Sequence, residues 1–311
     1  MMVPNLFIVT IIVFLLVRMV PGDVIDSMMA DAGGQFVGAT NIESREALEK
    51  ALGLDVPVYV QYSRWIGGIF QGDLGDTLWG YEPVSDKIFR RLPVTFELGL
   101  MSIIIGLLIS LPVGIYSAIR QDTISDYIAR SLAIVFISVP SFWLGTMIMI
   151  YPAVWWGWTP PMELIHFTED PLGNLGMFII PSVLLGMGLS GTTMRMVRTM
   201  MLEVLRQDYI RTAWSKGLKE KVVIMRHALK NALIPVVTII GFQIPILVGG
   251  SVIIEQIFVL PGMGRLMVSA LSQRDYPIVS GVNLILASSV LIINLLVDLT
   301  YAYLDPRLQY R

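Results

Sequence analysis

The chain has no cysteine and only two histidines, His166 and His227. The lack of cysteine excludes disulfide bonds, cysteine-ligated zinc, iron–sulfur clusters and thiol nucleophiles. The two histidines fall on opposite sides of the membrane in the topology derived below, which argues against a multi-histidine metal site. We therefore expect no metal or cofactor bound to this chain.

Charge is also scarce in this sequence. Charged residues make up 15% of the chain and hydrophobic residues 55%, with a mean hydropathy of +0.70. Soluble domains carry about 25% charged residues. The composition therefore indicates an integral membrane protein.

Six runs of residues are long and apolar enough to cross a bilayer, for which about 20 residues suffice as a helix. They cover residues 3–20, 95–119, 128–155, 175–197, 232–258 and 279–303. We interpret the first run as an uncleaved span, because the small-x-small pattern Ala30–Ala32 lies far beyond it. The runs predict an all-α integral membrane protein with six transmembrane helices.

The charges of the loops orient these spans. Residues 21–92 include six basic and eleven acidic residues, and residues 157–176 include three acidic residues and no basic one. Between Arg195 and Lys230, nine lysines or arginines stand against three acids. Because basic loops stay in the cytoplasm, the first two regions are predicted outside and the third inside. Both termini are then cytoplasmic, in a plasma (inner) membrane.

The region between the first two spans is predicted to form a small external helical cap. Residues 42–54 have apolar residues at helical spacing and end near Gly53, a plausible helix stop. Residues 58–70 predict a second amphipathic helix, and residues 72–77 predict a turn. This region is too short for a separate enzyme domain.

Spans two to five each contain a proline. These are Pro112, Pro140, Pro181 and Pro245. Proline kinks a helix and frees a carbonyl group, and membrane bundles tolerate this where neighbouring helices satisfy the backbone. Two interpretations stay open here: ordinary membrane-helix composition, or hinges for a gate.

The basic loop before span five predicts two short helices and a corner. Asp208 is a good N-cap for a helix over residues 209–216. Ile210, Ala213 and Trp214 form one apolar face at i, i+3 and i+4. Gly217 suits a C-terminal stop, where a left-handed conformation costs glycine little.

The second predicted helix covers about residues 219–233 and leads into span five. Val222, Met225 and Leu229 form one stripe, and Lys219, Arg226 and Lys230 form another. A helix, a glycine corner and a second helix would make a rigid lever between a cytoplasmic partner and the spans. The alternatives are a solvated basic loop, or apolar residues that lie on the lipid interface.

The residues of this loop match a known family. DYIRTAWSKGL at 208–218 and RHALKNALIPVV at 226–237 closely resemble the coupling loop of inner-membrane permease subunits of ATP-binding-cassette (ABC) importers. Within that family, the chain is most similar to the first ("B" type) permease subunit of the dipeptide/oligopeptide/nickel branch. Nearly the whole chain takes part in the resemblance. Further matching pieces are Pro21-Gly22-Asp23, Gly72-Asp73-Leu74-Gly75, Arg91-Leu92-Pro93, Thr95, Glu255, Phe258, Pro261-Gly262, Gly264, Arg274-Asp275-Tyr276-Pro277 and Asp305-Pro306-Arg307. Lys230 replaces a proline that is frequent in the wider superfamily, as is common in the peptide branch.

The resemblance implies a type I ABC importer permease fold. Residues 1–93 would hold the first helix and the external cap, residues 94–304 a five-helix core, and residues 305–311 a cytoplasmic tail. The coupling loop covers about residues 203–231, and its coupling helix sits in a groove of the ATPase subunit. The residues implied in ATPase coupling are Asp208, Tyr209, Ile210, Arg211, Ala213, Trp214, Gly217 and Leu218.

The resemblance also implies partners and a cargo. The partners are a second homologous permease subunit, two cytoplasmic ABC ATPase subunits and an extracytoplasmic substrate-binding protein. The cargo is a dipeptide, an oligopeptide or a related small solute such as a nickel chelate, and the sequence does not choose among these and sugars. No nucleic acid is expected.

Catalytic motifs are missing from the sequence. No G-x-x-x-x-G-K-[ST] phosphate loop occurs, so ATP and magnesium are expected on the partner ATPase subunits and this chain is not an enzyme. Gly188-Leu189-Ser190-Gly191 has the form of an intramembrane protease motif. That reading needs a base within hydrogen-bond reach of the serine, and neither histidine lies in a span. Small residues for close helix packing are the better interpretation.

Ionisable residues within the spans are few. Asp298, with Asn294 one turn earlier, lies in span six, and Glu97 and Glu255 lie near the external ends of spans two and five. An acid at mid-bilayer costs about 2.5–3.5 kcal/mol and therefore faces protein or water. Asp298 is either paired inside the bundle or part of a gate or pathway with Asn294 and Glu255. An ion-coupled secondary transporter acting alone is the alternative function.

Overall fold

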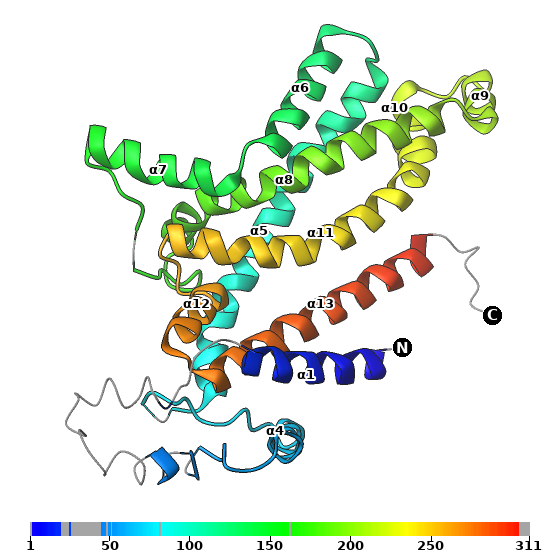
Figure 1. Ribbon diagram of the computed structural model, residues 1–311. Coiled ribbons are helices and arrows are strands. Elements are labelled where there is room, and N and C mark those ends of the chain that lie inside the picture. Colours follow the sequence, from blue (N-terminus) through cyan, green and yellow to red (C-terminus); the bar gives the residue numbers. More distant parts are fainter. Residues whose placement is uncertain are drawn as a thin grey trace. The chain divides into compact units, whose positions relative to one another are not determined.

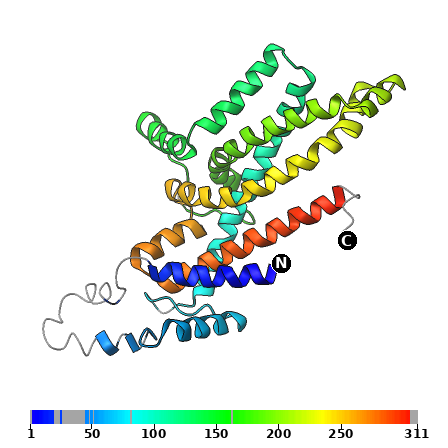
Figure 2. The ribbon, with the colours of Figure 1, turned by 45° about the vertical axis from the view of Figure 1, so that its right-hand side comes forward.

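The computed structural model is helical almost throughout (Figures 1 and 2). It describes residues 2–19, 25, 45–47, 49–50, 52–80, 82–161 and 163–304. Unit 1 is formed by residues 1–93 and 265–289, and unit 2 by residues 94–264 and 290–311. Outside these described ranges lie Pro21–Asp23, part of the first predicted cap helix, and the tail 305–311.

Within the residues that the structure describes, four helices are long and apolar enough to cross a membrane. They are α5 (Val84–Ile119), α8 (Pro171–Leu205), the continuous helix Glu220–Ile257 and α13 (Tyr276–Leu304). A bent pair, α6 (Ile124–Ser138) and α7 (Ser141–Trp156), makes a fifth. The predicted all-helical architecture, built on apolar helices of spanning length, is thereby confirmed. The sixth crossing rests on α1 (Met2–Met19), which is apolar but shorter, and stays a prediction.

In unit 1, helix α4 packs on α1 through aromatic side chains. Helix α4 covers Val58–Phe70, as the sequence predicted. The ring centroids of Phe14 and Tyr62 lie 5.2 Å apart, and the hydroxyl groups of Thr10 and Tyr62 are 2.9 Å apart. Gly53 has a φ of +65°, which fits the predicted helix stop. The side chains of α4 therefore pair with α1, while the external position of this region stays a prediction.

A buried carboxyl group orders the other part of unit 1. Helix α12 (Met263–Gln273) is followed by Asp275, which accepts from the N–H of Ile278 at 3.5 Å. Burial raises the pKa of the Asp275 carboxyl. The indole N–H of Trp79 donates to the carbonyl oxygen of Gln273 at 2.9 Å. The hydrogen bond from Trp79 connects the turn at residues 75–80 to the corner between α12 and α13.

In unit 2, the third predicted span is broken rather than kinked. Helices α6 and α7 meet at 86°. The residue before a proline is pushed into an extended conformation, and Val139 has φ −86° and ψ 119°. Pro140 then precedes the first residue of α7. The single helix expected over residues 128–155 was therefore wrong.

The other predicted kink sites lie inside continuous helices. Pro181 is within α8, and Pro245 is within α11 (Leu229–Ile257). Pro112 is likewise within α5. Among the described spans, Pro140 is thus the proline at which a helix ends, and it does so because Val139 has left the helical region.

Glycines bring α5 and α8 into close contact. A methyl group added at Gly186 would lie 2.6 Å from the backbone oxygen of Ser102, and one at Gly106 would lie 2.5 Å from the Leu189 side chain. At Gly114 it would lie 2.9 Å from the backbone oxygen of Met194. Small residues at these positions let the two backbones approach, as membrane helices require.

We predict that Gly186→Ala destabilises unit 2, because the new methyl group must displace the α5 backbone. The expected cost is about 1–3 kcal/mol. Gly176→Ala, in the same helix but with no atom within 4 Å of the added methyl group, is the control. Thermal denaturation of the purified complex measures both. Equal melting temperatures for the two variants would contradict this packing.

Candidate functional site

Helix α9, Asp208–Ser215, lies at the far tip of unit 2, beyond the ends of α8 and α11 (Figures 1 and 2). The predicted N-cap was wrong by one residue. Gln207 occupies that position with φ −72° and ψ 149°, and its carbonyl oxygen accepts from the N–H of Ile210 at 3.1 Å. Asp208 is the first helical residue, where its charge still complements the helix dipole.

The inner face of α9 consists of Ile210 and Ala213. Ile210 is fully buried and Ala213 nearly so. They join an apolar cluster that includes Val197 and Met201 of α8, and Ala118 of α5. Trp214, which the sequence placed on the same face, is instead 44% exposed. Two of the three residues on the predicted apolar face therefore anchor the helix to the body of unit 2, and the third does not.

The second helix begins with α10 (Glu220–Val222) and a π-helical turn, η1 (Val223–Ala228), and continues as α11. Of the predicted stripe, Val222 and Met225 are exposed and Leu229 is partly buried. The buried residues are Val223, Ile224, Ala228, Ala232 and Val236. A π-helical turn holds more residues than an α-helical one, so the side chains shift from the faces that α-helical spacing predicts.

Two features fix the shape of this segment. Gly217 has a φ of +74°, so the predicted left-handed stop is confirmed. The side-chain N–H of Asn231 in α11 donates to the Tyr209 hydroxyl at 2.8 Å. Helix α9 is thus attached to the start of α11 by apolar packing on one face and by a hydrogen bond at its edge.

The outer side of α9 is polar, with aromatic residues beside it. Asp208, Arg211, Thr212 and Ser215 are exposed, and a salt bridge of 3.5 Å joins Arg211 to Asp208. Tyr209 and Leu218 are exposed as well as Trp214. All eight predicted coupling residues therefore lie on or next to one short helix, six of them exposed and two buried beneath it.

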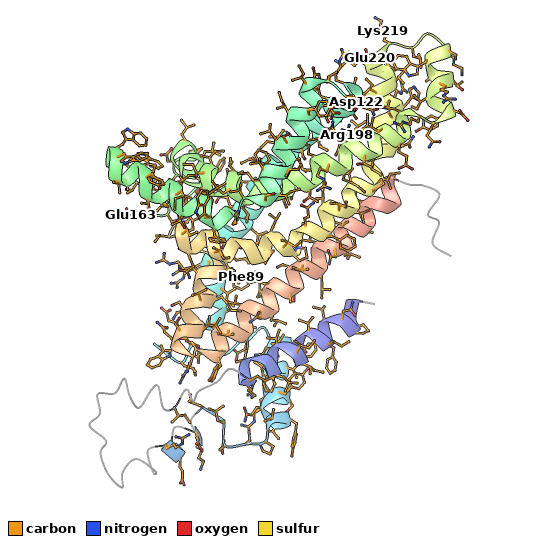
Figure 3. All side chains as sticks on the ribbon, turned by 45° about the horizontal axis from the view of Figure 1, so that its top comes forward. Phe89, Asp122, Glu163, Arg198, Lys219 and Glu220 are labelled. Carbon is orange, nitrogen blue, oxygen red and sulfur yellow. The ribbon has the colours of Figure 1, made fainter. Side chains whose placement is uncertain are left out.

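A buried ion pair that the sequence analysis missed lies near the same end of unit 2. The Arg198 guanidinium of α8 donates from Nε and Nη2 to the two carboxylate oxygens of Asp126 in α6, each at 2.7 Å. Ser117 of α5 donates its hydroxyl proton to the same carboxylate. Figure 3 labels Arg198 and Asp122 at this end, which also carries Lys219 and Glu220. We call Ser117, Asp126 and Arg198 the clamp.

The sequence contained one part of the signal for the clamp, the cap of α6. Thr123 stands three residues before Asp126 and caps α6, its side chain accepting from the Asp126 N–H at 3.5 Å. Asp126 itself lies two residues before the predicted third span, in a polar stretch, so its burial did not follow from the hydropathy of the sequence. Arg198 was counted only as one of the loop charges, so no partner was assigned.

A cavity of about 380 Å³ lies where the broken span meets α8 and α11. It is lined mainly by apolar side chains, and its polar groups include Ser141, Thr192 and Gln243. The described side chains that line it carry no charge. Gly188, the first residue of the protease-like motif, lines this cavity. A methyl group added at Gly188 would have no atom within 4 Å, so this glycine does not serve close helix packing.

Glu255 of α11 lies in a closed hydrogen-bond network. Its carboxylate is fully buried and accepts from the Thr95 hydroxyl at 2.7 Å, and the Thr95 oxygen accepts from the Met263 N–H at 2.8 Å. Gly262 and Gly264 leave the room that this carboxylate fills. The arrangement orders the loop after α11. A pathway role for Glu255 stays a prediction.

The other predicted pathway residues lie in α13. Asn294 is exposed. Asp298 is within the helix, but its side chain lies outside the described residues. Ser190 donates to the Met187 carbonyl oxygen at 2.8 Å and is buried. Within the described residues, no group of three acidic or histidine side chains is placed to hold a metal ion.

Comparison with known proteins decides the family. Residues 110–310 match the model of the binding-protein-dependent transport system inner membrane component. Residues 2–99 match the N-terminal model of the same kind of membrane component.

The chain belongs to this family.

Two curated relatives cover the whole chain. The oligopeptide transport system permease protein AppB of Bacillus subtilis is 39% identical over 313 residues, which are 100% of this chain and 97% of AppB. The dipeptide transport system permease protein DppB of Escherichia coli is 36% identical over 334 residues, with the same coverage. The resemblance inferred from the loop motifs is confirmed.

Solved structures show the same fold. The MetNI methionine ABC transporter in an inward facing conformation has a TM-score of 0.55 at 20% identity, covering 72% of this chain and 99% of the matched chain. An amino acid ABC transporter has a TM-score of 0.54 at 14% identity. The family models and the curated relatives make this protein a permease subunit of an ABC importer, from a family of transport subunits rather than enzymes, and a lone secondary transporter is not favoured.

We predict that Gly217→Val reduces uptake per ATP hydrolysed. A β-branched residue at φ +74° costs about 1–2 kcal/mol relative to glycine, which strains the corner that positions α9 although space for a side chain is present. Gly217→Asn is the matched control, because asparagine tolerates the left-handed region. Membrane insertion should persist in both. Wild-type coupling in the valine variant would defeat the rigid-corner argument.

Proposed function

We propose that this chain forms half of the translocation pathway of a peptide importer and receives force through α9. The observation that carries the proposal is that α9 is buried on one side and exposed on the other. Ile210 and Ala213 fix one side to the body of unit 2, while Tyr209, Trp214 and Leu218 remain exposed beside it. Tyrosine and tryptophan dominate the binding energy of protein interfaces. An exposed Tyr–Trp pair on a charged cytoplasmic helix therefore suits a protein partner.

The proposed partner at α9 is an ATPase subunit. The residues proposed for coupling are Asp208, Tyr209, Ile210, Arg211, Ala213, Trp214, Gly217 and Leu218. The rest of the importer would be a second homologous permease, a second ATPase and an extracytoplasmic binding protein. ATP and magnesium would bind the ATPases. The proposed membrane orientation has both termini in the cytoplasm, and the basic composition of residues 195–230 supports it.

ATP can drive transport only if it binds two states of the importer with different affinity. Closure of the ATPases around ATP would move α9 and open the spans outward, and hydrolysis would reset them. In this scheme, the uncharged cavity at the broken span contributes to the pathway wall. Asn294, Asp298 and Glu255 are proposed gate or pathway residues, of which Asn294 is exposed on α13.

The proposed domain division is residues 1–93, 94–304 and 305–311. The boundary between unit 1 and unit 2 at Pro93 supports the first division point. Residues 265–289 belong to unit 1, whereas the proposed division counts them in the core. The proposed six-helix type I arrangement adds α1 and the bent pair to the four long helices.

Peptides are the proposed cargo. The relatives that match along their whole length are named for oligopeptide and dipeptide transport. The cavity has no charged side chain among the residues that line it, and its hydroxyl and amide groups suit the neutral backbone of a peptide. Nickel chelates are the alternative cargo.

We predict that Trp214→Ala weakens ATPase association by about tenfold or more, since interface tryptophans commonly contribute over 1 kcal/mol. Trp156→Ala is the matched control, because Trp156 is exposed on α7. Co-purification and a titration of the ATPase against membranes measure the effect. Unchanged association with altered lipid partition would mean that the Trp214 ring contacts lipid.

A second prediction concerns the cargo and the energy source. Proteoliposomes with this chain, its permease partner, both ATPases and the binding protein should accumulate labelled dialanine on ATP addition. Ionophores that dissipate ion gradients should not prevent uptake. Uptake that needs an ion gradient but no ATPase would contradict the ABC importer mechanism. ATP-driven uptake of a nickel chelate with none of dialanine would reject peptides alone.

A further inference from the structure

We propose that the clamp of Ser117, Asp126 and Arg198 makes the cytoplasmic ends of α6 and α8 move as one body, so that motion of α9 reaches the break at Val139–Pro140. Asp126 and Arg198 are then positioning residues for coupling. The proposal rests on the proposed coupling role of α9 and adds the route by which its motion reaches the spans.

The first step is the geometry of the ion pair. Two parallel N–H···O contacts of 2.7 Å form a bidentate pair, which fixes orientation as well as distance. The Asp126 side chain is fully buried and that of Arg198 is 18% exposed. A sliding motion of α8 along α6 would break both hydrogen bonds at once and leave a buried carboxylate without its main cation. Such motion is therefore opposed more strongly than by packing alone.

The clamp also contacts α5, through Ser117, and the corner before α6, through Asp122. Arg198 Nε lies 3.1 Å from the Ser117 hydroxyl oxygen, and the Asp122 N–H donates to Asp126 at 3.0 Å. Asp122 has a φ of +60°, a conformation that non-glycine residues seldom adopt. The carboxylate of Asp126 thus accepts from α5, α8 and the loop that begins α6.

A second cation extends the charge network along α6. Arg130 lies 3.6 Å from the Asp126 carboxylate, with its guanidinium 4.4 Å from the Tyr127 ring centre. This contact is single, and at 3.6 Å it is longer than either of the two 2.7 Å hydrogen bonds from Arg198. The buried, bidentate pair with Arg198 is therefore the interaction that fixes the relative position of the two helices.

The clamp lies between α9 and the break. On one side, Val197 and Met201, which flank Arg198 along α8, pack in the apolar cluster that holds Ile210 of α9. On the other side, α6 runs from Asp126 to Ser138, directly before the break. Close packing continues along the way, since a methyl group at Gly191 would lie 2.8 Å from the Ala133 oxygen. Displacement of α9 therefore has a continuous path to the cavity.

The Asp126–Arg198 ion pair supplies a directional contact in addition to side-chain volume. Apolar side chains of similar volume often replace a buried ion pair without loss of stability. What they cannot reproduce is the directional, bidentate contact. The double variant Asp126→Leu/Arg198→Met consequently separates stability from positioning, because it removes both charges together and leaves neither one unpaired.

We expect the double variant to assemble with its partner subunits and to hydrolyse ATP, with dialanine uptake per ATP reduced about tenfold, a typical size for coupling between sites. Arg198→Lys, which keeps the charge but loses the bidentate geometry, should show an intermediate loss. Arg195→Lys, an exposed arginine one turn earlier in α8, is the matched control. Wild-type uptake per ATP in the double variant would overturn the proposal.

A distance measurement covers the case in which a variant fails to assemble. Because this chain lacks cysteine, spin labels at Ile128→Cys in α6 and Thr199→Cys in α8, both exposed, can be placed singly on it with cysteine-free partners. With the clamp intact, the label distance should be equal in nucleotide-free and ATP-trapped complexes. A shift of about 3 Å or more moves the guanidinium beyond hydrogen-bond reach and would overturn the proposal.

These readouts keep the two proposals apart. The label distance needs no substrate, so absence of dialanine uptake with a constant distance rejects only the peptide cargo. Absence of ATPase binding to the wild-type chain rejects the docking role of α9 before the clamp is tested. In an assembled double variant, the distance distribution should broaden. A distribution as narrow as that of the wild type would show that packing alone positions α6.

Discussion

The burial of Ile210 and Ala213 beneath α9 is the contact on which the rest of the account depends. A short helix at the end of two long spans has little stability of its own. It keeps one position because two apolar side chains enter the cluster formed by α5, α8 and η1, and because Asn231 donates to Tyr209. Only a helix fixed in this way can pass a displacement to the spans instead of absorbing it.

In unit 2, the helices α5, α6 and α8 are tightly packed at one end, whereas the backbone is interrupted at the break between α6 and α7. Helices α5 and α8 approach closely at Gly106, Gly114 and Gly186, where even a methyl group would clash. The clamp joins α6 to both of them at one end. The break at Val139–Pro140 interrupts the backbone ladder next to the cavity. A stiff block that ends at a break concentrates deformation there, which is where a pathway wall would need to change.

Much of the fold followed from the sequence because it depends on local rules. Runs of apolar residues predicted the membrane helices, and Gly53 and Gly217 occupy left-handed positions at helix ends as expected.

The features that the sequence did not predict have non-local causes. Val139 was pushed out of the helix by Pro140, whereas Ile180 stayed helical before Pro181, and neither outcome can be read from composition. At the π-helical turn, Val223 and Ile224 are the buried side chains, whereas Val222 and Met225 of the predicted apolar stripe are exposed. Asp126 and Arg198 are 72 residues apart, so their pairing required the fold.

The central claim is that the exposed side of α9 meets an ATPase, and a photo-crosslinker tests it most directly. A benzophenone attached at Ser215→Cys, on the outer side of α9, is unique on this cysteine-free chain. On illumination of native membranes, the account predicts a covalent product with the ATPase subunit, with a yield that changes when ATP is trapped. A product with lipid alone, at the same yield with and without ATP, would contradict it.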